Sequence, residues 1–227
     1  MIRLPFPKKD ENSKGQKKPE NQGAPPAQAQ VKQGSSPKDP GHEPCRRREA
    51  ALRKVIDRYR DHIEAGETKT VPDLKNLIDP KSKAVQEVKQ KIEDSFHPYL
   101  YEANFEAAAD KAFGFLRDDI GDEALPVDFW LSPDDVIELK LADEMDKAIF
   151  LCSLIIALDN ETAKVVVETN GTRHAFVMFE FKEKFHLMDP VHNVNLSGSR
   201  EEVVEKHLSG HEQKLVYEFN NKGYKEW

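Results

Sequence analysis

The stretch "KLADEMDKAIFLCSL", residues 140–154, decides how this sequence folds. Three acidic residues, Asp143, Glu144 and Asp146, lead directly into a long apolar run, Ala148–Leu158. Asp143 is well suited to be a helix N-cap, and the acidic residue three positions later supplies most of a capping box. Carboxylates in the first turn also face the positive end of the helix dipole. Because the run is apolar on all sides, we predict a central, buried helix that spans Asp143–Leu158.

Composition restricts the classes of protein that fit. The chain has 227 residues and a net charge of −7, whereas a general nucleic-acid binder would show a basic face. Its two cysteines, Cys45 and Cys152, are too few for a disulfide framework and favour a reducing compartment. The first residues lack the apolar core of a signal peptide, and the longest apolar run is about half of a membrane span. We therefore expect a soluble, cytoplasmic protein that binds neither nucleic acid nor membrane.

Residues 1–45 are predicted to be a disordered tail. Eight of the fourteen prolines lie in this segment, with Lys, Gln, Gly and Ser between them. Almost nothing apolar follows Phe6, so the segment cannot bury enough surface to offset its ordering entropy. The tip "MIRLPFP" alternates apolar residues. It is interpreted either as a remnant without a role or as a short peptide that adds to the sheet edge of a partner.

The ordered part begins with helices and ends with strands. Helical spacing of apolar residues predicts helices up to about residue 139, where Ser132 and Pro133 match an N-cap and a first helical residue. After Leu158, three segments rich in β-branched and aromatic residues predict consecutive antiparallel strands. A helix and a last strand follow. This order of elements predicts the α+β class. The strand segments are "AKVVVET", "RHAFVMFEF" and "KFHLMDP"; the last helix and strand are "REEVVEKHL" and "KLVYEFN".

Three blocks of the sequence resemble the transglutaminase-like family, a group with the papain-like fold that includes bacterial and archaeal transglutaminase-like cysteine peptidases. The blocks are "WLSPDDVIELKLADEMDKAIFLCSLIIAL", "HAFV" and "FHLMDP", and they occur in the order of the family. The resemblance covers roughly residues 97–195. It implies a buried central helix packed on a small antiparallel sheet, in a transglutaminase-like domain over residues 97–227. Residues 46–96 would then form an N-terminal helical portion.

The resemblance implies a catalytic set, and the sequence departs from that set at its nucleophile. In the family a cysteine begins the buried helix, and an imidazole and a carboxylate from two neighbouring strands complete the site. The base position falls on His174 and the orienting position on Asp189, but Glu144 occupies the position of the cysteine. A carboxylate cannot form a thioester, although it can keep the charge pattern of a thiolate–imidazolium pair. Glu144, His174 and Asp189 are therefore predicted to form an inactive network that holds the helix to the sheet.

This departure supports three functional hypotheses. The first is an inactive transglutaminase-like domain that serves as a polypeptide-binding or scaffolding module. The second is an enzyme of altered chemistry, in which Glu144, His174 and Asp189 perform acid–base or metal-assisted hydrolysis. The third is an unaltered cysteine peptidase or transglutaminase. Cys152 is a poor substitute nucleophile, because it lies inside the apolar run about 12 Å along the helix from Glu144.

A metal site is a more specific functional alternative for the same residues. If clustered, Glu144, His174 and Asp189 would offer one nitrogen and two carboxylates, with His186 and His192 on either side of Asp189. No fixed local spacing of a metal motif is present, so we expect no metal and no cofactor. Trp130 is a candidate for the wall of a substrate groove, and an aromatic core anchor is the alternative.

Overall fold

The computed structural model describes residues 43–65, 71–123, 130–170, 172–208 and 215–226. The tail expected at residues 1–45, including its "MIRLPFP" tip, lies outside the described residues up to position 42. The described elements mix helices with an antiparallel sheet, which confirms the predicted α+β class. In chain order they are α1 (Glu43–Ala65), α2 (Val71–Leu77), α3 (Lys83–Glu93), α4 (Tyr101–Asp118), β1 (Gly121–Asp122), α5 (Pro133–Leu139), β2 (Leu141–Ala142), α6 (Glu144–Ala157), β3 (Lys164–Asn170), β4 (Thr172–Phe181), β5 (Lys184–Asp189), β6 (Val194–Gly198), α7 (Arg200–Leu208), β7 (Leu215–Phe219) and β8 (Tyr224–Glu226).

Helix α6 is the central element, as the opening stretch of sequence predicts. Asp143 is its N-cap, and the capping box with Asp146 is complete in both directions. Leu158 caps its carboxyl end. Nearly every residue of the helix is buried, Ile149, Phe150 and Leu151 completely. Burial of each such side chain stabilises the fold by about 1.5–3 kcal/mol, so the start of α6 is held in a fixed position.

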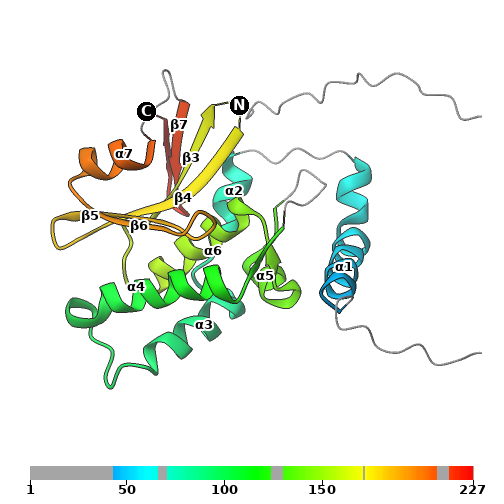
Figure 1. The fold of residues 1–227 in the computed structure, drawn as a ribbon, viewed down its shortest axis with the longest axis horizontal. Coiled ribbons are helices and arrows are strands. Elements are labelled where there is room, and N and C mark those ends of the chain that lie inside the picture. Colours follow the sequence, from blue (N-terminus) through cyan, green and yellow to red (C-terminus); the bar gives the residue numbers. More distant parts are fainter. Residues whose placement is uncertain (1–42, 66–70, 124–129, 171, 209–214, 227) are drawn as a thin grey trace, which may run out of the picture.

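The main sheet has six strands in the order β6-β5-β4-β3-β7-β8, and every neighbouring pair is antiparallel. Its two faces carry different residues because side chains alternate along a strand. On β4, Ala175 and Val177 belong to the core shared with α6, whereas Phe176 and Met178 belong to a smaller cluster with Val203 of α7. The sheet therefore lies between α6 on one face and α7 on the other (Figure 1).

The N-terminal helices share the main core. Ala51 and Val55 of α1 and Val85 of α3 lie in the same cluster of buried residues as α6. Helix α1 is also tied to α5 by ion pairs from Arg58 to Asp135 and Glu138. Buried residues on both sides of position 96 thus belong to one cluster, and the division into a helical portion (46–96) and a domain (97–227) stays a prediction.

The short strands β1, β2, β6 and β8 were not predicted. Strand β6 and the terminal strand β8 are short and largely polar or exposed, so they lack the apolar alternation that identifies a strand. They form because neighbouring strands offer unpaired backbone groups.

No described helix is both long enough and apolar enough to cross a membrane.

Candidate functional site

The acidic start of α6 divides into structural and site residues. Asp143 Oδ1 accepts the N–H of Asp146 at 2.8 Å, and the N–H of Asp143 donates to Asp146 Oδ2 at 3.2 Å. The other oxygen of Asp146 accepts the N–H of Leu131 at 2.8 Å. Burial is the main reason that the pKa of Asp146 is raised well above its usual value. These two residues build the helix start and leave Glu144, at the first helical position, free to point toward β4.

Glu144 links helix α6 to the sheet. Its Oε1 accepts the N–H of Ala175 at 3.0 Å. Ala175 lies outside the part of β4 that pairs with β5, which begins at Val177. A carboxylate from the helix therefore satisfies a strand N–H next to the place where the ladder to β5 ends. A buried N–H left without such a partner would be costly.

His174 and Asp189 come from adjacent antiparallel strands. His174 alternates with Ala175 on β4, so it lies on the same face as Phe176. Asp189 ends β5 and lies on the same face as Leu187. The two side chains meet at this end of the sheet, where His174 Nε2 is 2.8 Å from Asp189 Oδ2. The structure thus brings together the three residues that the resemblance singles out.

The way in which they meet differs from a catalytic relay. Glu144 Oε1 lies 3.1 Å from His174 Nε2, the same ring nitrogen that contacts Asp189. In a serine-protease type of triad, the nucleophile and the orienting carboxylate use different nitrogens of the imidazole. One nitrogen carries at most one hydrogen and can donate to only one of the two carboxylates. His174 Nδ1 instead faces Glu168 Oε2 at 3.9 Å.

Two further histidines complete the cluster. His192 Nδ1 lies 2.9 Å from Asp189 Oδ2 and 3.8 Å from Glu144 Oε1. His207, on α7, places its Nε2 3.7 Å from Asp189 Oδ2. Sequence reasoning considered His192 only as a neighbour of Asp189 and missed His207. No local signal marks His207, because its position depends on how α7 packs on the sheet.

Burial and the neighbouring polar groups shift the pKa values of Glu144, His174 and Asp189 in opposite directions. Burial raises the pKa of Glu144, and this outweighs the N–H of Ala175 and the charge of His174, which lower it. Burial lowers the pKa of His174, but the hydrogen bond with Asp189 and the charges of Glu144 and Asp189 raise it overall. Burial raises the pKa of Asp189, and hydrogen bonds from His174 and His192 outweigh it and lower the value. Burial, followed by the nearby charge of His174, lowers the pKa of His207.

Other residues singled out from the sequence lie elsewhere. Cys152 is fully buried, and burial raises the pKa of its thiol well above the usual value. Cys45 is exposed on α1, a helix that an ion pair from Arg58 to Asp135 ties to α5. His186 faces the opposite side of the sheet, with its Nε2 3.9 Å from Glu106 of α4. Trp130 is 2% exposed within the main core, a position that fits an anchor and gives no support to a groove wall.

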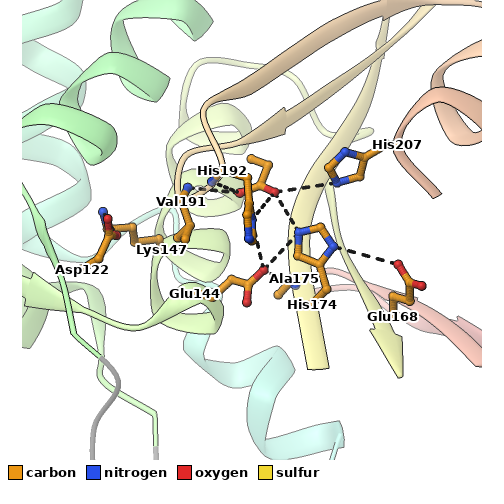
Figure 2. A network of polar contacts seen from close by, with 10 residues as sticks. Asp122, Glu144, Lys147, Glu168, His174, Ala175, Val191, His192 and His207 are labelled. Atoms are coloured by element: carbon orange, nitrogen blue, oxygen red, sulfur yellow. Dashed lines mark hydrogen bonds and ion pairs between the residues drawn. The ribbon is translucent and has the colours of Figure 1, made fainter. Parts of the chain in front are cut away.

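Lys147 is the remaining unusual group of the opening stretch. Its side chain is fully buried, and its ammonium group forms an ion pair with Asp122 of β1, whose side chain is 57% exposed. The pair joins α6 to the small parallel pairing of β1 with β2 (Figure 2). Lys147 is therefore separate from the carboxylate–imidazole cluster.

The fold and this cluster define an α+β domain with two carboxylates and three imidazoles converging at one end of its sheet. No protein-family model matches the sequence, and curated proteins give no significant match.

Among solved structures, the chain is similar to Legionella pneumophila LapG, with a TM-score of 0.46 and 15% identity over 69% of this chain and 87% of LapG. Calcium-bound and EGTA-treated LapG each give a TM-score of 0.44 and 14% identity over 69% of this chain, covering 87% and 84% of LapG respectively. At this level the likeness is a distant one and assigns no role to any residue.

Proposed function

We propose that this chain is a transglutaminase-like domain of the papain-like fold that has lost its nucleophile and serves as a polypeptide-binding or scaffolding module. The observation that carries the proposal is the position of Glu144. Its carboxylate occupies the amino end of the buried helix, 3.1 Å from the imidazole of His174, where the resemblance expects a thiolate. A carboxylate there can hold the imidazole and a strand N–H, but it cannot form the thioester that this chemistry requires.

Neither cysteine supports thiol chemistry in the cluster. Cys152 lies eight residues beyond Glu144 on α6, about 12 Å along the helix axis, and its buried thiol resists ionisation. Cys45 lies on α1. The sharing of one His174 nitrogen by Glu144 and Asp189 also argues against a proton relay.

A binding role is supported by how accessible the cluster is. The side chains of Glu144 and His174 are 24% and 22% exposed, and that of His192 is 54% exposed. A polypeptide segment could therefore contact these groups without any unfolding. Charged residues that sit at a solvent-accessible end of a sheet and are fixed by a rigid scaffold are suited to recognition.

Activity assays of the pure protein test the first half of the proposal. Fluorogenic peptides and an amine-transfer assay should show no turnover that iodoacetamide abolishes. The Glu144→Cys variant is the matched comparison, since it restores sulfur at the same position. Alkylator-sensitive turnover that disappears in Cys152→Ala or Cys45→Ala would overturn the proposal.

Binding assays test the second half. An array of unstructured peptides should yield ligands whose affinity falls at least tenfold in His192→Arg and remains within twofold in His97→Arg, a control at another exposed histidine. A complete lack of ligands, or equal loss in both variants, would contradict a recognition role for the cluster.

A further inference from the structure

The cluster at the end of the sheet contains a buried nitrogen that none of the described residues satisfies. His207 Nε2 has no hydrogen-bond partner in the part of the chain that the structure describes, although its side chain is only 7% exposed. The ring points into the cluster and ends 3.7 Å from Asp189 Oδ2 (Figure 2). Buried polar atoms are almost always paired, and an unsatisfied one commonly indicates a missing water or ion.

The donor atoms around this nitrogen already have the spacing of a coordination shell. One atom each from Glu144, His174, Asp189 and His192 lies within 4.8 Å of all the others. Four of these separations are 2.8, 2.9, 3.1 and 3.8 Å. Ligands at 2.0–2.1 Å from a tetrahedral zinc ion are about 3.3–3.4 Å apart. The remaining separations are at most 4.8 Å, so shifts of up to about an ångström would bring all four atoms into range of one ion.

Asp189 is held in the orientation that such a site needs. Its Oδ1 accepts the backbone N–H groups of Val191 and His192, each at 3.0 Å. This pair of bonds fixes the carboxylate and aims Oδ2 at the imidazoles of His174, His192 and His207. Ligand carboxylates are typically oriented by hydrogen bonds of this kind from outside the coordination shell.

The charges of the site also favour a cation. Every described partner of the Glu144 and Asp189 carboxylates is an imidazole or a backbone N–H. Without a metal, the carboxylates of Glu144 and Asp189 both face the one proton that His174 Nε2 can carry, although Asp189 Oδ2 also contacts His192 Nδ1 at 2.9 Å. A divalent ion between them would replace that proton and would neutralise both negative charges.

We propose that Glu144, His174, Asp189 and His192 bind one divalent transition-metal ion, with zinc as the best fit, and that His207 supports the site as a positioning residue. Two imidazoles and two carboxylates suit zinc and, more weakly, iron or manganese. The half-exposed ring of His192 gives the ion a path from solvent. His207 Nε2 is placed to donate to Asp189 Oδ2 after a movement of less than an ångström.

This inference stands independently of the proposed function. Four protein ligands fill a tetrahedral shell and leave no open position for a substrate or an activated water, which is the pattern of a structural metal site. Loss of metal binding would leave the argument about the missing nucleophile intact. Thiol-dependent turnover would likewise leave the metal site untouched.

Metal titration of the untagged full chain tests the proposal. Protein treated with EDTA is incubated with zinc, dialysed and measured by elemental analysis, and affinity is obtained by competition with a chromophoric chelator. We expect one zinc ion per chain. His192→Ala, at a half-exposed ligand, and Asp189→Asn should each weaken binding at least tenfold, whereas His97→Ala, at an exposed histidine outside the cluster, should remain within twofold.

Cobalt substitution tests the geometry and the part played by His207. Cobalt(II) in the wild type should show the strong visible absorption of a tetrahedral site, and His192→Ala should lose it. His207→Gln should keep the absorption with a shifted maximum and bind 10–100-fold more weakly, as expected of an outer-shell partner. Sub-stoichiometric zinc, affinity unchanged in His192→Ala, or binding equally weakened in His97→Ala would overturn the proposal. Circular dichroism of each variant confirms that it is folded.

Discussion

Removal of the Glu144 carboxylate is the most direct test of its role as a link between helix and sheet. In Glu144→Ala the N–H of Ala175, a residue only 2% exposed, loses its partner. An unsatisfied buried donor costs about 1–3 kcal/mol. The contact with His174 at 3.1 Å is lost as well, but the variant also avoids the burial that raises the pKa of Glu144. These two effects oppose each other, so we expect a net cost of about 1–3 kcal/mol.

The isosteric variant separates the hydrogen bond from the charge. Glu144→Gln keeps a carbonyl oxygen that can accept the N–H of Ala175, so it should cost less than about 1 kcal/mol. Glu106→Ala is the matched control, because Glu106 faces His186 at 3.9 Å but is 53% exposed on its side chain. Its effect should stay within about 0.5 kcal/mol.

Urea unfolding in EDTA at pH 7 measures these differences. The midpoint should fall in Glu144→Ala while the slope against urea stays constant, as expected when only stability changes. A cost below about 0.5 kcal/mol in Glu144→Ala would refute the idea that the carboxylate links α6 to β4. An equal cost in Glu144→Gln would show that charge, rather than the hydrogen bond, holds the two elements together.

Three further results are expected. Asp122→Asn leaves the buried ammonium of Lys147 without its partner, so chemical unfolding should show that the free energy of unfolding falls by about 1–3 kcal/mol. This is less than for a fully buried pair, because Asp122 is half-exposed. In a Lys147→Met background the same substitution should have a much smaller effect. In the native chain a thiol reagent should modify one cysteine rapidly and reach Cys152 only in denaturant, and two fast equivalents would contradict its burial. Burial raises the pKa of Asp135, but hydrogen bonds from Ser132, Tyr59 and Arg58 outweigh it and lower the value. The stability that Asp135 adds over Asp135→Asn should therefore be complete at pH 5 and should decrease progressively as the pH falls below about 4 and through the lowered pKa. A difference in stability that stays constant or grows as the solution is acidified would contradict this.

Local patterns in the sequence were enough for much of the fold. The capping box of Asp143 and Asp146 involves residues three positions apart, and the apolar run after it can only form a buried helix, so the start and burial of α6 were predicted correctly. The pattern of "RHAFVMFEF" likewise predicted a strand, but it is apolar on both faces, so only the structure decided that Ala175 and Val177 face α6 while Phe176 and Met178 face α7. Strand β6 could not be predicted, because its pairing with β5 supplies what its own pattern lacks.

The sequence, through its resemblance to the transglutaminase-like family, predicted a site at Glu144, His174 and Asp189, with a glutamate where that family has its cysteine. Only the tertiary structure decided that Glu144 and Asp189 meet at the same nitrogen of His174, because this depends on how helix, strand and ring are oriented in space. The tertiary structure also placed His207, eighteen residues after Asp189, beside that carboxylate, because α7 packs on the outer face of the sheet. Spacing along a chain predicts contacts within a helix or between adjacent strands, whereas the convergence of groups from four separate parts of the chain is determined by packing.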